Sequence, residues 1–223
     1  HLASISGGTD IVSCFVLGNV FQPVYIGEIQ NRGLGMDVDI FDEKGHSIKN
    51  KKGELVCKKP FPSMPVKFWN DKEDTKYQSA YFTRYKNVWH HGDFAKITNE
   101  GGFIIYGRSD TTLNPGGVRL GTAEIYSVVE KFEEVQESIV IGQSWNNDIR
   151  IILFVVLNKG YELNNTIKDK IKKSIRLKAS PRHVPSKILA VTEIPKTKNG
   201  KLVELAVKQT IEGEEIKNLE ALA

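Results

Sequence analysis

The segment Ile151–Leu157 is the longest uninterrupted apolar run in the chain. It is far shorter than the roughly 20 residues that a helix needs to cross a hydrocarbon core, so the sequence argues against a membrane span. An apolar run without polar alternation is typical of a strand that is buried on both faces. The fold must therefore contain a sheet that other elements cover.

A helix is predicted shortly before this run, because apolar residues recur there at i, i+3, i+4 and i+7. Thr122 is expected as its N-cap, and Glu124 lies favourably in the positive first turn. The recurring apolar residues are Ile125, Val128, Val129 and Phe132.

Four further elements are predicted in the second half of the chain. Strands are expected over Ser138–Gly142 and Lys187–Ile194, and a short helix over Leu202–Ile211. The segment Thr166–Lys178 has isoleucines four residues apart with lysines between them, which predicts an amphipathic helix. Together these elements indicate a small α+β domain in which helices cover a short sheet.

The first half has a different pattern, made of short alternating stretches between glycine-containing turns. Met36–Phe41 alternates apolar and polar residues, Asp42–Gly45 is a turn, and Gly53–Cys57 is a second short strand. A further hairpin is predicted from Phe94–Ile97 to Phe103–Tyr106. This half is expected to be a mainly antiparallel sheet.

The character of the sequence changes near Asp110, where we place a domain boundary. Residues 1–110 are predicted to be the β-rich end of a larger N-terminal domain, with a helix over Asn70–Arg84. Residues 111–223 are predicted to form the small α+β domain. The expected fold class of the whole chain is α+β.

Charge and cysteine content narrow the class of protein. The net charge of +4 and the pI near 8.9 suit anionic small ligands and are weak evidence for a nucleic-acid partner. Cys14 and Cys57 cannot form a disulfide framework and lack metal spacing, so a cytoplasmic setting is expected. The chain starts at His1 without a signal peptide, which suggests a cut inside a longer protein.

Two stretches of the first half could hold a nucleotide. Ser6–Asp10 joins two glycines, which allow a close backbone approach, to a hydroxyl and a carboxylate suited to Mg²⁺. The carboxylate of His91–Asp93 and the arginine of Gly107–Asp110 could together clamp a ribose diol. The adjacent His90 and His91 would point to opposite faces of a strand and could not chelate one metal.

Two stretches of the second half add a glycine pair and a lysine-rich turn. Asn114–Arg119 could pass close to a thin ligand, and Pro195–Leu202 could deliver a lysine to a phosphate. Taken singly, Asn114–Arg119 is explained equally well by an ordinary loop, and each of the other stretches is more commonly an ordinary turn or a solvated loop. The sequence contains neither the GxxxxGK[ST] phosphate loop nor a GxGxxG turn.

In this order, the stretches resemble the signature of the acyl-adenylate-forming ligases, which include acyl-CoA synthetases, luciferases and peptide-synthetase adenylation domains. Gly116–Ile125 is similar to the short-chain branch of the family. Ser4–Phe15, Ser180–Pro185 and Gly200–Glu204 are similar to the members that activate acetoacetate. The resemblance implies adenylation of acetoacetate by ATP with Mg²⁺, and then transfer of the acyl group to coenzyme A.

The resemblance also implies roles for individual residues. Lys201 corresponds to the lysine that enters the site for adenylation. The residues implied to contact the nucleotide are Gly7, Gly8, Thr9, Asp93 and Arg108.

Five other positions correspond to the metal, hinge and coenzyme A elements of the family. Asp10 stands where most members have a magnesium-binding glutamate, and its shorter side chain is expected to act through water. Asp110 corresponds to the hinge between half-reactions. Gly116 and Gly117 correspond to the loop that admits pantetheine, and Arg119 to the arginine beside it.

The sequence departs from the family pattern in three further respects. The lysine that is common in the family before the glycine of its Gly-x-Arg element is missing. His91 stands where the family has threonine, and the Ser/Thr/Gly-rich pyrophosphate loop is not in these 223 residues. We therefore expect the chain to need the rest of its own N-terminal domain and to be inactive alone. No nucleic-acid partner is expected.

Two other functions fit the sequence. One is an adenylating enzyme or short-chain acyl-CoA synthetase with another acid or acceptor. The other is a non-catalytic nucleotide-binding or basic interaction module, for which the interleaved isoleucines and the lack of stacking aromatic residues are unfavourable. The basic residues of such a module would be Lys168, Lys170, Lys172, Lys173, Arg176 and Lys178.

Overall fold

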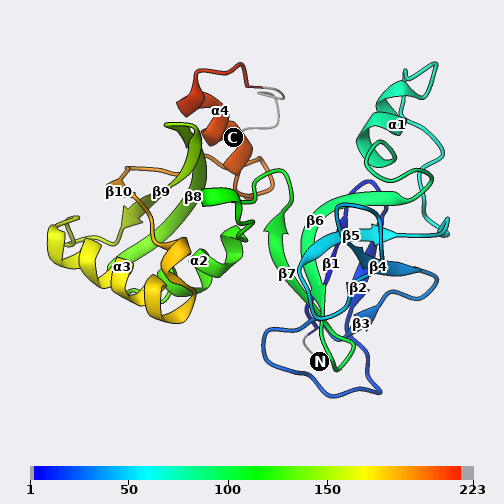
Figure 1. Ribbon diagram of the computed structural model, residues 1–223, viewed down its shortest axis with the longest axis horizontal. Helices are drawn as coiled ribbons and strands as arrows, with labels where there is room; N and C mark the ends of the chain where they lie inside the picture. The colour runs from blue at the N-terminus through cyan, green and yellow to red at the C-terminus, as the bar shows by residue number, and fades with distance from the viewer. Residues whose placement is uncertain (1–2, 217–223) are drawn as a thin grey trace. The chain divides into compact units, whose positions relative to one another are not determined.

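The computed structural model describes residues 3–216, which divide into two compact units between Ile105 and Tyr106 (Figure 1). The boundary between the units lies within strand β7 (Phe103–Arg108). The domain boundary near Asp110, which the change in sequence character predicts, stays a prediction. The predicted α+β class is confirmed.

Two antiparallel sheets make up the first unit. The order of the smaller sheet is β1-β2-β3, and the order of the larger is β4-β5-β6-β7. The strands before β7 are β1 (Ser6–Gly8), β2 (Ser13–Leu17), β3 (Asn31–Arg32), β4 (Val38–Phe41), β5 (Gly53–Cys57) and β6 (Trp89–Ile97).

The predicted hairpins are confirmed, and a turn explains the first one. β4 pairs with β5 so that Val38 lies opposite Cys57. Between them, the Asp42 carboxylate accepts the Lys44 and His46 N–H groups at 2.9 and 2.8 Å. These two bonds close the turn that the Asp42–Gly45 segment predicted.

Helix α1 (Thr75–Tyr81) is shorter than the predicted Asn70–Arg84. The Asp71 carboxylate accepts the Tyr77 N–H at 2.8 Å, and Asp74 at the N-cap adopts a left-handed φ of 54°. These features confine the helix to the seven residues that follow Asp74.

An aromatic cluster fills the core of the first unit. Trp89 is fully buried, and Tyr81 stacks on it with ring centroids 3.7 Å apart. Phe15 and Phe61 also pack edge-on against Trp89. Trp89 is the first residue of β6, the strand that also holds Asp93.

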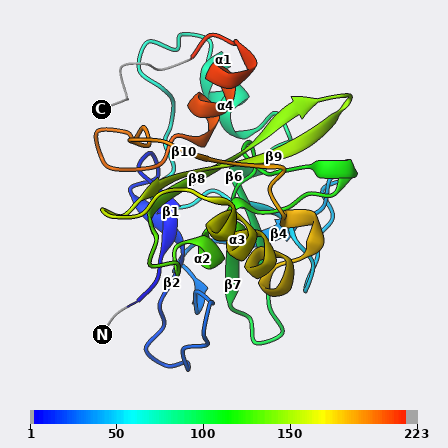
Figure 2. The ribbon, with the colours of Figure 1, turned by 90° about the vertical axis from the view of Figure 1, so that its left-hand side faces the viewer.

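The second unit is built on one mixed sheet of order β10-β9-β8, in which β9 is antiparallel to β8 and parallel to β10. Helices α2 and α3 lie side by side on one face of it (Figures 1 and 2). The elements are α2 (Thr122–Val129), β8 (Val135–Trp145), β9 (Asp148–Leu157), α3 (Asn165–Lys178), β10 (Lys187–Ala190) and α4 (Glu204–Glu212).

The apolar run Ile151–Leu157 forms most of β9, and every residue in it is buried or half-buried. Leu153 and Val155 face the core formed with Ile171 of α3, whereas Ile152 is buried on the opposite face. The prediction of a strand covered on both faces is therefore confirmed. None of the helices in residues 3–216 is long and apolar enough to cross a membrane.

The start of α2 differs from the prediction. Gly121 and not Thr122 is the N-cap, and the Glu124 carboxylate accepts the Gly121 N–H at 3.0 Å. A Cβ on Gly121 would lie 2.4 Å from the Tyr106 carbonyl oxygen, so the chain needs glycine at the cap. Thr122 is instead the buried first residue of the helix.

The other helix and strand predictions of this unit are confirmed with changed ends. α3 begins after Asn164, whose side chain accepts the Ile167 N–H at 3.0 Å. Phe132 lies beyond the end of α2 but packs on the same core. The strand predicted over Lys187–Ile194 stops at Ala190, although the Val191 N–H still donates to the Val155 carbonyl at 3.0 Å.

Candidate functional site

Strand β1 is glycine-rich because its backbone runs against other groups. A Cβ on Gly7 would lie 2.2 Å from the Ser13 carbonyl oxygen of β2. A Cβ on Gly8 would lie 3.0 Å from Cε1 of His91 and 3.1 Å from Oδ1 of Asp10. The strand therefore reaches these groups only without side chains, while Gly7 itself stays exposed.

Asp93 is a buried carboxylate at the middle of β6. The Ser6 hydroxyl donates to its Oδ2 at 3.3 Å, and Nε2 of His91 lies 3.7 Å from the same oxygen. The His91 ring packs edge-on against Phe15, 4.7 Å between centroids. The structure thus brings the stretch Ser6–Asp10 together with the stretch His91–Asp93, and these contacts hold the Asp93 carboxylate in one orientation.

His90 and His91 point in different directions, as predicted. Nε2 of His90 lies 3.0 Å from Oε2 of Glu54, and Arg84 pairs with the other oxygen of Glu54 at 3.1 Å. Within residues 3–216, no group of three or more histidine, cysteine, aspartate or glutamate side chains could hold a metal ion.

Asp10 is exposed in the turn that follows β1, and its Oδ2 accepts a hydrogen bond from the Tyr81 hydroxyl. Because Tyr81 stacks on the buried Trp89, its hydroxyl is held in place. A single oriented carboxylate fits a magnesium ion that keeps most of its ligands as water and phosphate oxygens.

Arg108 and Asp110 lie together in the second unit, both exposed. Nε of Arg108 is 3.6 Å from Oδ1 of Asp110. The Thr111 hydroxyl donates to the Arg108 carbonyl at 3.3 Å, and the Thr112 hydroxyl donates to the Ser109 carbonyl at 2.8 Å. Side-chain bonds therefore support the backbone around the predicted hinge.

Gly116 and Gly117 form an exposed 3₁₀ turn, Pro115–Gly117, with positive φ angles of 58° and 77°. The Asp148 carboxylate accepts the Gly116 N–H at 2.8 Å and the Ile149 N–H at 2.7 Å. These two bonds hold the pKa of Asp148 below its usual value.

A hollow of about 610 Å³ lies beside this turn. The residues that line this hollow are Asn114, Gly117, Ser144, Trp145, Asn146, Asn147, Asp148 and Ile149. Arg119, two residues after Gly117, is half-buried.

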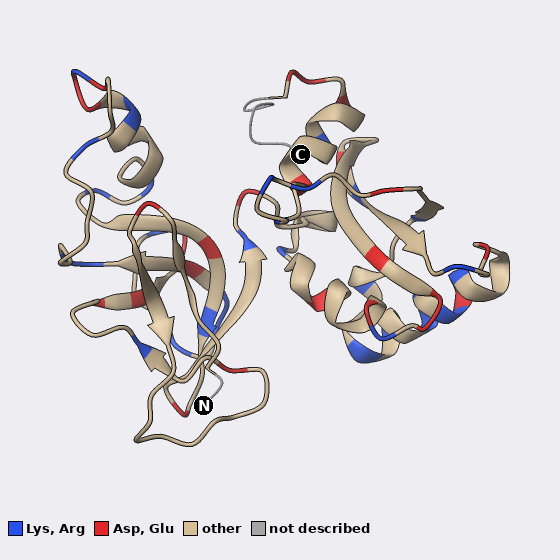
Figure 3. Ribbon diagram, turned by 180° about the vertical axis from the view of Figure 1, so that it is seen from behind, with Lys and Arg blue, Asp and Glu red and all other residues tan. Residues whose placement is uncertain are grey.

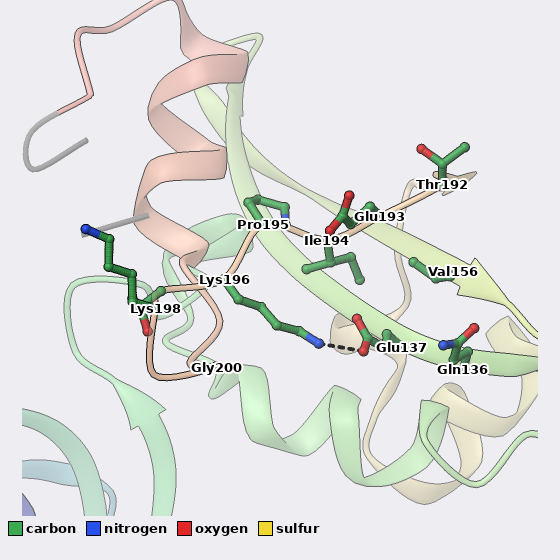
Figure 4. A pocket seen from close by; sticks show the side chains of 11 residues that line it. Gln136, Glu137, Val156, Thr192, Glu193, Ile194, Pro195, Lys196, Lys198 and Gly200 are labelled. Carbon is green, nitrogen blue, oxygen red and sulfur yellow. Dashed lines mark hydrogen bonds and ion pairs between the residues drawn. The ribbon is translucent and has the colours of Figure 1, made fainter. Parts of the chain in front are cut away.

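Lys201 is exposed on the loop Pro195–Leu202, which closes on itself. The Thr197 N–H donates to the Lys201 carbonyl at 2.8 Å, and the Thr197 hydroxyl accepts the Lys201 N–H at 3.1 Å. Gly200 supplies the positive φ of 76° that the turn requires. A hollow of about 700 Å³ lies along this loop (Figure 4).

Each end of the loop is anchored. At its start, Nζ of Lys196 pairs with Oε1 of Glu137 on β8 at 2.5 Å (Figure 4). After it, the Tyr126 hydroxyl donates to Oε1 of Glu204 at 2.5 Å and accepts the Val140 N–H at 3.1 Å. Burial, with Glu204 nearby, raises the pKa of Tyr126, so this hydroxyl stays a donor.

The basic residues of α3 occupy the side of the helix away from its core. Figure 3 shows this helix with blue segments along it, and Ile167, Ile171 and Ile175 are buried beneath. Lys170 pairs with Glu134 at 3.1 Å. The arrangement is that of an amphipathic helix with a solvated basic face.

The predicted site residues lie in both units. The first unit holds Gly7, Gly8, Thr9, Asp10 and Asp93, and it places Asp10 beside Gly8. The second unit holds Arg108, Asp110, Gly116, Gly117, Arg119 and Lys201.

Sequence reasoning missed Ser6 as a partner of Asp93, Tyr81 as a partner of Asp10, and Glu137. Tyr81 and Asp10 are 71 residues apart, so no local pattern could indicate their contact. For Ser6, the only indication in the sequence was its place on a short strand, where every second side chain points to the same face.

Comparison with known proteins confirms the predicted resemblance. Residues 124–201 match the model of the AMP-binding enzyme C-terminal domain. The chain is 60% identical over 223 residues to the acetoacetyl-coenzyme A synthetase of Rhizobium meliloti, covering 100% of this chain and 34% of that protein. It is 50% identical over 220 residues to the acetoacetyl-CoA synthetase of Rattus norvegicus, covering 97% and 33%.

The comparison with solved structures finds a protein of the same name. The acetoacetyl-CoA synthetase from Streptomyces lividans superimposes with a TM-score of 0.93 at 42% identity, covering 99% of this chain and 34% of that one. The chain therefore spans about a third of the length of the relatives it matches.

Proposed function

We propose that the chain is the C-terminal part of an acetoacetate–CoA ligase. A carboxylate oxygen of acetoacetate attacks the α-phosphorus of ATP and expels pyrophosphate. The coenzyme A thiol, giving its proton to solvent, then attacks the acyl carbon and expels AMP. The observation that carries the proposal is the 60% identity over the whole chain to an acetoacetyl-coenzyme A synthetase.

The nucleotide contacts are assigned to both units. The Asp93 carboxylate accepts hydrogen bonds from the ribose hydroxyls, and the Arg108 guanidinium donates to the ribose oxygens. The contact of Asp93 with Ser6 supports the first role. Gly7 and Gly8 bring backbone close to the phosphates, and Thr9 offers its exposed hydroxyl to the α-phosphate.

Magnesium is the proposed metal, held chiefly by ATP phosphates and water. Asp10, whose Oδ2 accepts from the Tyr81 hydroxyl, would hold the ion through one or more of those waters. The metal, when bound, neutralises phosphate charge.

Lys201 is the proposed catalytic lysine. Its ammonium group stabilises the negative charge that spreads over the carboxylate and phosphate oxygens during adenylation. Asp110 is the proposed hinge. Coenzyme A is assigned to Gly116, Gly117 and Arg119, because the two glycines of this exposed turn carry no side chain that would obstruct a thin ligand.

Two further aspects complete the proposal. The rest of the same protein supplies the pyrophosphate loop and most of the acyl pocket. The cytoplasm is the proposed location, consistent with free thiols at Cys14 and Cys57.

The test uses the full-length protein that contains this chain. With ATP, Mg²⁺ and coenzyme A, acetoacetate should drive AMP and pyrophosphate release with a higher kcat/KM than acetate or butyrate. A preference for another acid would keep the enzyme class and overturn the acyl assignment. Absence of acid-dependent AMP, with salt-sensitive RNA binding, would favour a basic interaction module.

The 223-residue chain alone serves as the second arm. It should release no pyrophosphate, because its sequence lacks the pyrophosphate loop. Pyrophosphate release by this chain would show that the upstream region is dispensable.

A further inference from the structure

The loop that bears Lys201 is tied to strand β8 by the ion pair between Lys196 and Glu137 (Figure 4). We propose that Glu137 is a positioning residue for adenylation: through Lys196 it fixes the base of the loop, and so the direction in which Lys201 is presented. This inference rests on the proposed function of Lys201.

The loop is constructed so that a shift at its base reaches Lys201. Lys196 and Leu202 form a backbone bridge across the base of the loop. Thr197, the next residue, is bonded to both the N–H and the carbonyl of Lys201. A change in the position of Lys196 therefore moves the backbone of Lys201 with it, because few bonds in the loop can rotate independently.

The other end of the ion pair is rigid. Glu137 lies opposite Val156 of β9, directly after a bulge at which the register of β8 shifts. Two residues later, Ile139 is fully buried. A bulge re-aims the side chains next to it, and here the carboxylate points toward the loop (Figure 4).

Lys198 provides a contrast within the same loop. Its side chain is exposed and points away from Glu137 (Figure 4). Lys196 and Lys198 carry the same charge at almost the same place in the chain. A difference between their variants would therefore report the ion pair and not the net charge of the loop.

The experiment measures both half-reactions in the full-length protein by rapid quench, for Glu137→Gln, Lys196→Met and the matched control Lys198→Met. In the first two variants, adenylation should slow about fivefold, the most that a partly exposed ion pair supplies. Thioester formation from added acetoacetyl-AMP should not change. Lys198→Met should leave both rates unchanged.

Two further measurements separate positioning from simple destabilisation. Combining Glu137→Lys with Lys196→Glu should restore most of the adenylation rate, because the pair forms again with its charges exchanged. High salt should narrow the difference between wild type and Glu137→Gln, since partly exposed charges are screened.

The outcomes are distinct. Unchanged adenylation in Glu137→Gln and Lys196→Met, or equal loss of both half-reactions with a lowered melting temperature, would overturn the positioning role alone. A wild-type protein that makes no adenylate would overturn the proposed function, and this inference with it.

Discussion

The predicted nucleotide contacts of the first unit stand on paired strands, whereas the predicted catalytic lysine of the second unit stands on a loop. In the first unit, Asp93 is buried and Gly7 lies against the backbone of β2. In the second, Lys201 is exposed, and a Cβ added at Gly117 would point into open space. The difference suggests that one region is shaped to bind and the other to deliver a group, and each can be tested separately.

The largest effect is expected for Lys201→Ala in the full-length protein. Adenylation should fall by at least about 10²–10³-fold, as when one donor to a developing charge is removed. Thioester formation from supplied acetoacetyl-AMP should persist, because the lysine is expected to leave the site when the small domain rotates. Separate single-turnover assays of the two steps measure this.

Lys198→Ala is the control for that prediction, since it removes a neighbouring lysine from the same loop. Equal losses in both half-reactions of Lys201→Ala would contradict the delivery role. A loss confined to thioester formation would assign Lys201 to the other step.

Asp110→Pro in the full-length protein should have the opposite pattern. Proline fixes φ near −65°, and a hinge must change its backbone angles. The thioester step should fall by about 10²-fold, since even a small misplacement of reacting groups is costly. Adenylate should accumulate during the reaction and be detected after it is quenched with acid.

Asp110→Ala keeps the backbone free and should retain both steps, although it loses the contact with Arg108. Unchanged thioester formation in Asp110→Pro, or a parallel loss of both steps with a lower melting temperature, would remove the hinge assignment.

Alanine substitutions at Gly7 and Gly117 compare the two regions directly in the 223-residue chain. Gly7→Ala should destabilise the first unit by about 1–3 kcal/mol, because the new Cβ would overlap backbone of β2. Gly117→Ala should cost the second unit only about 1 kcal/mol, since it strains a positive φ in open space.

Hydrogen exchange resolved by peptide can assign each loss to its unit. Peptides of β1 and β2 should lose protection in Gly7→Ala, and those of α3 should not. Equal effects of the two substitutions would mean that the strand pair is no more tightly constrained than the loop.

The smallest effect concerns Asp148, which holds the glycine turn. Its pKa is lowered in the folded chain by the N–H groups of Gly116 and Ile149, so its support is complete at neutral pH. The support should be lost only below about pH 4, as the pH falls through the folded pKa. The amide proton shift of Gly116 should titrate there, and that of Leu113 should not.

In Asp148→Asn the Gly116 shift should no longer titrate. A flat Gly116 shift in the wild type would show that the carboxylate does not hold the turn in solution.

Secondary structure was predictable where the pattern was long and regular. The isoleucines of α3 and the unbroken run of β9 fixed both elements, because burial of those residues decides their conformation. The cap of α2 was not predictable, because the close approach of Gly121 to Tyr106 depends on tertiary packing. The short α1 likewise follows from Asp71 and its contacts.

The candidate site was predictable only in part, for a similar reason. The motifs identified the backbone segments around Asp93 and Lys201. They could not identify Tyr81 or Glu137, since each meets its partner across a long separation in the chain: Tyr81 is 71 residues from Asp10, and Glu137 is 59 residues from Lys196. Contacts of that kind are set by how strands and loops pack.

The self-closed loop around Lys201 also affects the entropy of nucleotide binding. Ordering a free backbone costs roughly 1–2 kcal/mol for each residue. In this loop, the Thr197 bonds and the Lys196–Leu202 bridge have already removed that freedom during folding. When ATP binds, the lysine side chain alone has to be ordered, at about 2 kcal/mol of rotamer entropy, so more of its attraction for phosphate remains as affinity.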